Sequence, residues 1–335
     1  MILRVLAGNA SPSKPNRNNP GLQLDIKDGL ILFGLLFGFI VIIGKVLGGL
    51  GNQMFQYAAV RALALRRQVP LRLDATRFFG YTLHQGFELN AIFDCSVPLA
   101  TPQDMTDVLG WQATPIAQRV LGRLSMARFR SSRWLTEPHF TYWEELKSAP
   151  NTCYIDGYWQ SNKYFDDVED IIRKDFCFRQ PMSSKNSLLA AKIGDADSVS
   201  LHVRRGDYVT NKDASRIHTL CSIDYYDMSI REMANRIGRP HFFVFSDDVA
   251  WAKENISMAY PCDWIDHNIG SESYNDMRLM SLCKHHIVAN STFSWWGAWL
   301  NPSLEKVVMA PHPWFANELS ARDLIPNTWL RLGGI

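Results

Sequence analysis

The residues of this sequence best suited to chemistry are two adjacent arginines in the stretch HVRRGD, residues 202–207. The planar fork of an arginine side chain binds phosphate oxygens two at a time. Neighbouring side chains of an extended segment point to opposite faces, so one of Arg204 and Arg205 can reach an anion while the other pairs with an acid. The alternative is a pair of solvated arginines that form an ion pair with Asp207. We interpret the stretch as a candidate phosphate site.

A second stretch, FSDD at residues 245–248, ends a predicted strand with two carboxylates. A carboxylate at a strand end can accept hydrogen bonds from a donor-rich base such as guanine. The alternative is that Asp247 or Asp248 caps the helix that follows.

A third stretch, NSTFSWWGAW at residues 290–299, gathers hydroxyl groups at the start of a predicted helix. Hydroxyls and free backbone N–H groups at a helix N-terminus form a site for phosphate. The three side chains that could contribute are Ser291, Thr292 and Ser294. The alternative is an ordinary N-cap over a tryptophan-rich core helix.

The fourth stretch is glycine-rich and reads GKVLGGLGNQMFQYAAV, residues 44–60. A Walker A loop is excluded, because its spacing fails and Val46 follows the lysine. A dinucleotide fingerprint is excluded as well, because the position of its third glycine holds Met54. What remains is a glycine turn before a helix N-terminus, which can accept an anion or a sugar hydroxyl. The alternative is a tight turn without a ligand.

A metal site is not expected. His285 and His286 are adjacent on a predicted strand, so their side chains point apart. The six cysteines are scattered without a CxxC pair. We therefore expect six buried free thiols rather than a zinc site or disulfides.

The elements that must position these motifs alternate between strands and helices. A strand at 40–47, a helix at 52–68 and a strand at 69–75 form a βαβ unit, which predicts a parallel sheet. Helices are expected around 102–128, and a strand that starts near 151 runs into an aromatic loop before a helix at 166–176. The second half is expected to contain strands at 197–205, 241–248, 262–266, 285–290 and 306–311, and helices at 224–237, 249–255, 273–284 and 291–301.

Length and charge bound the class of protein. A chain of 335 residues suits two domains. A linker-like composition at 179–187 separates an N-terminal domain, 40–182, from a C-terminal domain, 183–335. We expect two doubly wound α/β domains with a crevice between the carboxyl ends of their sheets. A formal net charge of +2 without a basic stripe argues against nucleic acid as a partner.

Residues 1–39 are expected to form an extension that is first disordered and then apolar. The apolar run at 29–44 is shorter than the roughly 20 residues that span a bilayer, and its second half is needed for the strand at 40–47. We therefore favour either a peripheral segment, with membrane-surface contact through residues 29–39, or a merely buried segment over a spanning anchor. No cleavage site of a secretory signal follows.

Taken together, GGLGNQMFQYA (48–58), GYWQSNKYF (157–165), HVRRGDYV (202–209), FSDD (245–248) and NSTFSWWGAWL (290–300) resemble the α-1,2-fucosyltransferases of glycosyltransferase family 11. The resemblance covers about residues 44 to 315. It implies a GT-B fold of two Rossmann-like domains. It also implies inverting transfer of L-fucose from GDP-β-L-fucose to O2 of a galactose-terminated acceptor, without a metal.

The resemblance also implies roles for individual residues. Arg204 would hold the β-phosphate, and Arg205 and Asp207 would organise the motif. His202 and an acid of the FSDD stretch, Asp247, would read the guanine. The remaining residues expected to contact GDP-fucose are Gly49, Gly51, Asn52, Gln53, Ser291, Thr292 and Ser294.

The base that removes the acceptor proton is not evident from the motifs. Related α-1,6 enzymes carry a glutamate shortly after the arginine motif, where this chain has Asp213. Asp213 is one candidate for the base, and Asp207, a more structural residue, is another. Other GDP-sugar linkages on the same fold, and a non-catalytic nucleotide-sugar or glycan-binding protein, stay open as alternatives.

The chain departs from the family at its start, because about 40 residues precede the first strand. They are either an anchor or a start assigned too far upstream. A glycosylation sequon at Asn290 lies within the candidate phosphate loop, where a glycan would block the site. We therefore expect a cytoplasmic enzyme, at the membrane face.

Overall fold

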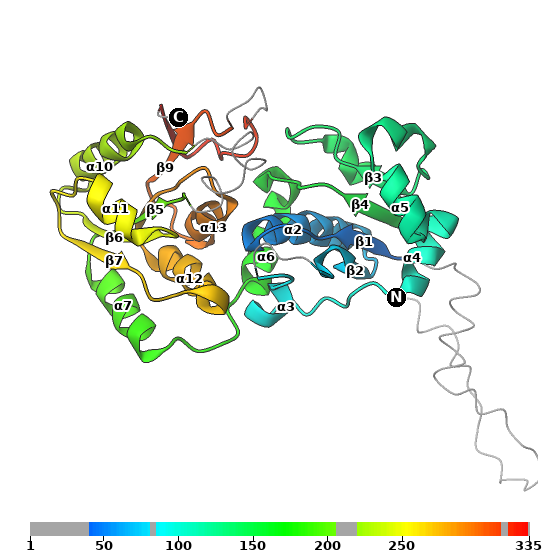
Figure 1. Cartoon of the computed structure of the whole chain (residues 1–335), viewed down its shortest axis with the longest axis horizontal. Helices are drawn as coiled ribbons and strands as arrows, with labels where there is room; N and C mark the ends of the chain where they lie inside the picture. The colour runs from blue at the N-terminus through cyan, green and yellow to red at the C-terminus, as the bar shows by residue number, and fades with distance from the viewer. Residues whose placement is uncertain (1–39, 81–84, 206–219, 316–320, 334–335) are drawn as a thin grey trace, which may run out of the picture. The chain divides into compact units, whose positions relative to one another are not determined.

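The computed structural model describes residues 40–80, 85–205, 220–315 and 321–333. They belong to one compact unit that spans Ile40–Ile335. Two parallel β-sheets form its framework, one from residues 42–156 and one from residues 198–333 (Figure 1). The two sheets fall on either side of the predicted boundary at residue 182, and the boundary itself stays a prediction.

The first sheet has four parallel strands in the order β2-β1-β4-β3. Its central strand β1 is followed on one side by β2 and flanked on the other by β4. From β1 the chain first adds β2 on one side and later adds β3 and β4 on the other side. The order in which strands are added therefore reverses between β1 and β4, although all four strands are parallel. The strands are β1 (Ile42–Lys45), β2 (Leu71–Asp74), β3 (Trp134–Thr136) and β4 (Cys153–Asp156).

The second sheet has six parallel strands in the order β10-β9-β8-β5-β6-β7. Counted along the chain from β5, this is the strand order 3-2-1-4-5-6 of a Rossmann domain, and the order reverses between β5 and β8. The strands are β5 (Ser198–Val203), β6 (His241–Ser246), β7 (Cys262–Ile265), β8 (His285–Ile287), β9 (Val308–His312) and β10 (Leu330–Gly333).

The helices connect the strands and cover the sheets. In the first lobe they are α2 (Leu50–Arg67), α3 (Leu89–Ile92), α4 (Pro102–Leu109), α5 (Pro115–Leu121) and α6 (Glu169–Asp175). In the second lobe they are α7 (Ser184–Asp195), α10 (Ile223–Ile237), α11 (Val249–Asn255), α12 (Tyr274–Leu282) and α13 (Thr292–Leu300). Short 3-10 helices lie between them, among them η2 (Gly110–Ala113) and η3 (Leu124–Phe129).

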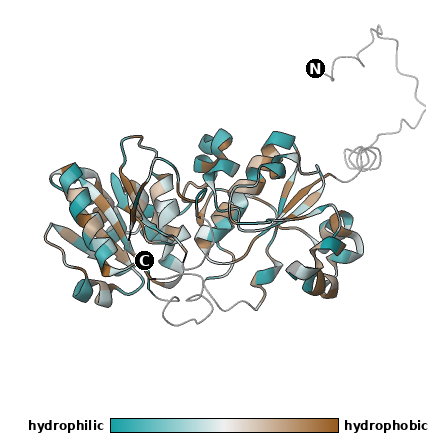
Figure 2. Ribbon diagram, turned by 90° about the horizontal axis from the view of Figure 1, so that it is seen from above, coloured by the Kyte–Doolittle hydropathy of each residue, from teal (hydrophilic) through white to brown (hydrophobic). Residues whose placement is uncertain are grey.

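Burial explains why the strands and helices adopt this arrangement. All six residues of β5 are buried, as expected for a strand of a parallel sheet that is covered on both faces. Figure 2 shows the strands mainly in the colours of hydrophobic residues, whereas the helices carry hydrophilic residues along one side. Helix α10 follows this pattern, because its buried residues Tyr226, Ile230 and Met233 share one face. Ser222 caps the start of this helix, and Gly238 ends it.

Helix α2 is an exception, because it is buried almost all round. It packs on β1 and on α13 of the second lobe. Phe55 lies between these elements, with its ring centre 4.4 Å from that of Trp295 and 4.9 Å from that of Trp296. One large hydrophobic cluster consequently includes residues of both lobes.

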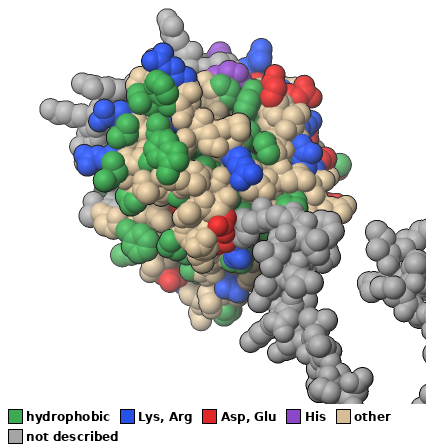
Figure 3. Space-filling view, turned by 90° about the vertical axis from the view of Figure 1, so that its right-hand side faces the viewer, with side chains coloured by type: hydrophobic (Ala, Val, Ile, Leu, Met, Phe, Trp, Pro, Cys, Tyr) green, Lys and Arg blue, Asp and Glu red, His purple; other side chains and the backbone are tan. Residues whose placement is uncertain are grey.

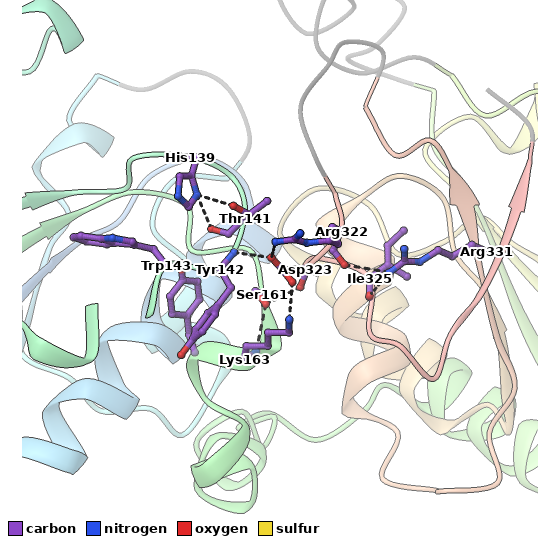
Figure 4. A network of polar contacts seen from close by, with 11 residues as sticks. His139, Thr141, Tyr142, Trp143, Ser161, Lys163, Arg322, Asp323, Ile325 and Arg331 are labelled. Carbon is purple, nitrogen blue, oxygen red and sulfur yellow. Dashed lines mark hydrogen bonds and ion pairs between the residues drawn. The ribbon is translucent and has the colours of Figure 1, made fainter. Parts of the chain in front are cut away.

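A polar network also joins the lobes (Figure 4). Its centre is Asp323, a buried residue that follows β9 in the chain. The Asp323 carboxylate accepts a hydrogen bond from the Tyr142 backbone N–H at 3.0 Å and pairs with Lys163 Nζ at 2.6 Å. The Ser161 hydroxyl donates to the Asp323 carbonyl oxygen at 2.6 Å. The network therefore fastens residues 321–325 to the aromatic loop of the first lobe.

The predicted strands and helices are largely confirmed, with differences at their ends. Helix α2 starts two residues before the expected residue 52, because Gly49 already adopts the N-cap conformation. The predicted linker at 179–187 is wrong at its end, because Ser183 caps α7 with a hydrogen bond from the Asn186 N–H. Strands β3 and β10 were not expected, since three and four residues are too few to show a period. Helix α7, which has twelve residues, was not expected either, because its start was assigned to the linker.

Two further expectations concern chemistry and the membrane. All six cysteines are free, but the expectation that all are buried is wrong, because Cys177 is exposed and Cys262 is half-buried. Among the described residues, no helix combines the length and the apolar composition that crossing a bilayer requires. Residues 29–39 lie outside the described residues.

Candidate functional site

The predicted motifs of the second lobe meet where the strand order of its sheet reverses. Strands β5 and β8 are neighbours in the sheet, and the chain leaves them toward opposite sides. In open α/β sheets, ligands bind outside the carboxyl ends of the strands at such a point. Arg204 and Arg205 of HVRRGD follow β5, and NSTFS follows β8. The topology therefore brings two of the predicted phosphate-binding motifs to one place.

The two arginines after β5 point to different partners. Arg204 Nη1 lies 2.9 Å from Asp247 Oδ2, and both side chains are about a quarter exposed. The guanidinium of Arg205 lies 3.9 Å from the ring centre of Trp251 and pairs with Asp248 at 3.8 Å. Arg204 is therefore the arginine that Asp247 holds at the carboxyl end of the sheet, whereas Arg205 packs on α11.

The two carboxylates of FSDD have separate functions. Asp248 caps α11 by accepting a hydrogen bond from the Trp251 N–H at 3.1 Å. Asp247 uses Oδ1 to accept from the Arg205 N–H at 2.9 Å and Oδ2 to pair with Arg204. Both oxygens of Asp247 are thus engaged by the arginine motif, which indicates that Asp247 orients the two arginines.

His202 lies within β5 beside these groups and is buried. Burial, the largest effect, lowers its pKa to about 4, so its imidazole is neutral near pH 7. Its Nδ1 atom has no hydrogen-bond partner among the described residues. A buried polar atom without a partner costs free energy. His202 is therefore able to form one hydrogen bond with a bound molecule.

The hydroxyl residues after β8 start helix α13. Ser291 is the N-cap and accepts a hydrogen bond from the Phe293 N–H at 3.3 Å. The buried Ser294 donates its hydroxyl to the Ser291 carbonyl oxygen at 3.3 Å. Thr292 is half-buried and lies at the contact with the first lobe. Ser291 and Ser294 therefore shape the helix start, and Thr292 lies at its edge.

The glycine loop of the first lobe reaches this helix start. Gly48 has a φ of +81°, a left-handed conformation that favours glycine. A Cβ atom on Gly51 would lie 2.6 Å from the Thr292 carbonyl carbon and 2.8 Å from the Phe293 nitrogen. The Trp296 indole N–H also donates to the Gly51 carbonyl oxygen at 3.0 Å. The first turns of α2 and α13 are consequently in direct contact.

The polar residues after these glycines brace the loop. Gln53 is fully buried, and its amide N–H groups donate to the carbonyl oxygens of Gly48 at 3.0 Å and Gly86 at 2.8 Å. Its carbonyl oxygen accepts from the Glu88 N–H at 3.0 Å. Asn52 accepts a hydrogen bond from Gln160 at 3.0 Å. The Gln53 side chain thereby ties the glycine loop to residues 86–88, and its backbone N–H donates to the Gly49 carbonyl oxygen at 3.1 Å.

Gly49 and Ser291 each lie at the N-terminus of a helix, where the electrostatic potential is positive. Gly49 caps α2 without a side-chain hydrogen bond, and no acid lies in the first turn of α2 or of α13. The N-terminus of each helix carries about half a positive charge and free N–H groups. Two such ends in contact, with Arg204 following the neighbouring strand β5, form a site suited to an anion.

The structure adds charged groups at the first sheet that sequence patterns did not single out. Lys45 ends β1 and pairs with Asp156, which ends β4, at 2.9 Å. Glu137 follows β3, and its carboxylate accepts from the Tyr158 N–H at 2.7 Å and the Trp159 N–H at 3.0 Å. Burial raises the pKa of Glu137 to about 7. A charged residue directly after a strand was the available signal, and it was missed because β3 is only three residues long.

A further missed group is Asp276, in the first turn of α12. Burial raises its pKa to about 7, and Asn268 Nδ2 donates to its Oδ1 at 2.8 Å. Asn268 lies in the loop after β7, at the same end of the sheet as Asp247. Periodicity assigned this residue to a helix but contains no signal for its burial.

Two predicted residues, Asp207 and Asp213, lie outside the described residues. Within the described part of the chain, no group of three or more His, Cys, Asp and Glu side chains is arranged to hold a metal ion.

Comparisons with known proteins agree with these motifs. The sequence model of glycosyl transferase family 11 matches residues 132–332. An alpha-1,2-colitosyltransferase of Escherichia coli is 35% identical over 298 residues, which cover 87% of this chain and 99% of that protein. The chain belongs to glycosyl transferase family 11. It is thus a glycosyltransferase.

Other relatives extend this similarity. The O-antigen biosynthesis glycosyltransferase WbnK of Escherichia coli is 34% identical, over 85% of this chain and 98% of its own length. A galactoside 2-alpha-L-fucosyltransferase of Caenorhabditis elegans is 25% identical, over 89% of this chain and 80% of its own length.

A solved structure supports the fold of this family 11 chain. The alpha-1,6-fucosyltransferase NodZ, soaked with GDP-fucose, superposes with a TM-score of 0.51 at 15% sequence identity, over 78% of this chain and 93% of that one. Another NodZ structure, from Bradyrhizobium, gives the same TM-score. The two parallel sheets and this similarity confirm the predicted GT-B type of fold.

Proposed function

We propose that the chain transfers L-fucose from GDP-β-L-fucose to O2 of a galactose-terminated acceptor, with inversion and without a metal ion. The observation that carries the proposal is the contact between the first turns of α2 and α13 at Gly51 and Thr292. A diphosphate bound there would meet two helix N-termini. Arg204 directly follows β5, and β5 is the neighbour of β8, the strand that precedes α13.

Arg204 and the first turns of α2 and α13 are suited to stabilising GDP as it leaves the sugar. Negative charge grows on the leaving diphosphate in the transition state, so fixed donors at that position accelerate the reaction. Arg204 supplies a guanidinium that Asp247 already orients at 2.9 Å. The N–H groups of α2 and α13 supply further donors that need no reorganisation. In this proposal they do the work that a divalent cation does in metal-dependent transferases.

Recognition of the nucleotide base needs a revised assignment. Asp247 is engaged by both arginines, so we assign it to holding Arg204 rather than to reading guanine. His202, neutral and with an unpartnered Nδ1 among the described residues, is the better-supported contact for the nucleotide.

Proton removal from the acceptor stays a prediction at Asp213, with Asp207 as the alternative. Glu137 has a pKa of about 7, which suits a base. Both of its oxygens, however, accept backbone N–H groups within the first lobe. We therefore assign Glu137 a structural function.

Colitose is a second candidate for the transferred sugar, because the colitosyltransferase of Escherichia coli is 35% identical to this chain. Colitose lacks the 3-hydroxyl group of L-fucose. A site that hydrogen-bonds this hydroxyl would reject the analogue strongly, whereas a site that does not would accept both sugars.

The deciding experiment measures transfer from GDP-fucose and from GDP-colitose to lactose and to N-acetyllactosamine, with linkage analysis of the products. An α-1,2-fucosylated product formed in excess chelator supports the proposal. If the enzyme prefers GDP-colitose, colitose rather than fucose is the sugar that it transfers. If excess chelator abolishes the activity, the reaction depends on a metal ion. Binding of GDP-fucose without turnover would indicate a non-catalytic binding protein.

We also propose a cytoplasmic location. Asn290 is buried, and its amide donates to the Trp314 carbonyl oxygen at 3.3 Å, so a glycan there would disrupt α13. Cell fractionation of the tagged chain tests this location, and attached N-glycan would contradict it.

A further inference from the structure

Helix α5 carries apolar side chains on two faces, although packing needs only one. Ala117 and Leu121 are buried in a hydrophobic cluster with residues of the first sheet. Ile116 and Val120, which are also four residues apart, are 79% and 42% exposed. Residues at this spacing lie side by side on a helix. The outer face of α5 therefore presents an apolar stripe to solvent.

Two aromatic residues extend this stripe. Trp111 in η2 is 68% exposed and Phe129 in η3 is 52% exposed. Gln112 donates to the Phe129 carbonyl oxygen at 3.2 Å, which ties η2 to η3. Arg130 Nε donates to the Leu121 carbonyl oxygen at 2.8 Å, which ties η3 to the end of α5. The exposed apolar side chains consequently belong to three neighbouring elements, η2, α5 and η3.

The same surface is strongly basic. Arg119 is exposed and shares the outer face of α5 with Ile116 and Val120. Arg123 is exposed as well and follows the end of α5, directly before η3. The guanidinium of Arg128 lies 4.8 Å from the ring centre of Phe129. We call these seven side chains, four apolar and three basic, the α5 surface. Figure 3 shows the face of the chain that carries α4 and α5, with hydrophobic side chains interspersed with basic ones.

Acidic groups are scarce around the α5 surface. Residues 108–136 contain five arginines and no aspartate or glutamate. On the neighbouring α4, Asp107 is exposed, whereas Asp104 is buried and pairs with Arg72 at 3.2 Å. The stretch 108–136 is therefore basic throughout, although Figure 3 also shows acidic side chains elsewhere on this face.

We propose that the α5 surface docks the enzyme on an anionic phospholipid bilayer. Exposed apolar and aromatic side chains surrounded by arginine bind the interface of such a membrane, because the apolar groups enter the headgroup region and the guanidinium groups pair with anionic lipid. A second copy of the chain fits poorly, since a symmetric contact across this surface would place arginines against arginines. The docking surface is distinct from residues 29–39.

The experiment measures binding of the full chain to vesicles of equal parts phosphatidylcholine and phosphatidylglycerol by flotation. The α5 variant is Arg119→Glu with Arg123→Glu. The matched control is Lys185→Glu with Lys192→Glu, which reverses the charge of two exposed basic residues of α7. We expect the α5 variant to bind about tenfold or more weakly, because each basic residue contributes several-fold. The control is expected to bind like the original chain.

A fluorescent probe separates this surface from any membrane contact elsewhere. A polarity-sensitive dye on Val120→Cys, in a chain whose Cys177 and Cys262 are serine, is expected to shift to the blue on mixing with the vesicles. A dye on Leu188→Cys is expected not to shift. Equal vesicle binding by the α5 variant and the control, or an unshifted dye at residue 120, overturns the proposal. Unchanged melting temperatures and fucosyl transfer to a soluble acceptor confirm that the variants are folded.

Discussion

Arg204 illustrates how a side chain is prepared for its function before any ligand binds. Its guanidinium is held by Asp247, and its neighbour Arg205 is stacked on Trp251. The fork of Arg204 is therefore oriented at little entropic cost when a diphosphate arrives. This orientation leads to a prediction about its replacement by lysine.

Arg204→Lys is expected to lower kcat/KM for fucosyl transfer by about two orders of magnitude or more, because an ammonium group cannot replace the two-pronged contact. The measurement is steady-state transfer from GDP-fucose. The control is Arg236→Lys, which alters an exposed ion pair with Glu232 on α10 and should leave the rate unchanged. Near-normal activity of Arg204→Lys would remove Arg204 from the proposed mechanism.

Asp276 predicts a dependence of stability on pH. Its pKa is raised from 3.8 to about 7 by burial, so the folded chain retains the proton more strongly than the unfolded chain. The stability that this group contributes is complete below about pH 4 and is lost as the pH rises through about 7, by up to about 4 kcal/mol. Asp276→Asn lacks this dependence, because asparagine stays neutral.

We therefore expect Asp276→Asn to melt at a higher temperature than the original chain at about pH 8, and at a similar temperature near pH 4. The readout is the difference between the two melting temperatures across this range. A difference that does not grow with pH would show that the Asp276 carboxyl group is not desolvated in the folded chain.

At the scale of elements, the site depends on how closely two helices approach. Helices α2 and α13 each follow a strand at a point where the strand order of its sheet reverses. Their first turns can touch only because Gly51 lacks a side chain. The glycine stretch is thus explained by packing between helices, in addition to its proposed contact with a ligand.

Gly51→Ala is expected to force α2 and α13 apart, because its Cβ would lie 2.6 Å from the Thr292 backbone. Overpacking of this kind costs about 1–3 kcal/mol of stability. We expect Gly51→Ala to melt at a lower temperature than the original chain and to bind GDP more weakly. Gly194→Ala in α7 is the control, since its Cβ would meet nothing within 4 Å. Equal GDP affinity in the two variants would refute the assignment of the α2–α13 contact to the site.

At the scale of the whole molecule, the described lobes are joined by packing and by the network around Asp323. The hydrophobic cluster shared by the lobes holds α2 against α13. The Asp323 carboxylate adds contacts to Tyr142 and Lys163, at a position where its side chain is only 5% exposed. The segment 321–325 therefore stabilises the aromatic loop that precedes α6.

Asp323→Ala is expected to cost about 2–4 kcal/mol, because it leaves a backbone N–H group and a lysine without their buried partner. Its melting temperature tests this loss. Lys253→Ala, which removes an exposed ion pair with Asp266 at 3.8 Å, should change stability by less than about 1 kcal/mol. Similar melting temperatures for both variants would show that the network contributes nothing.

The sequence by itself determined the family motifs, the parallel α/β class and most strand ends, because hydrophobic period and glycine turns are local properties of the chain. It correctly paired HVRRGD, FSDD and NSTFS with strand ends of the second lobe. It did not reveal that Asp247 is engaged by both arginines, or that Gln53 joins the glycine loop to residues 86–88. Such hydrogen bonds depend on which neighbours the fold supplies.

Only the tertiary structure decided that Gly51 meets Thr292 and that Asp323 reaches Lys163. The Gly51–Trp296 hydrogen bond joins positions 245 residues apart, and no local pattern contains a contact of that range. Residue types set the chemistry that is available at each position. Long-range packing decides which of those chemistries face one another, because a side chain's partners are fixed by the approach of whole helices and sheets.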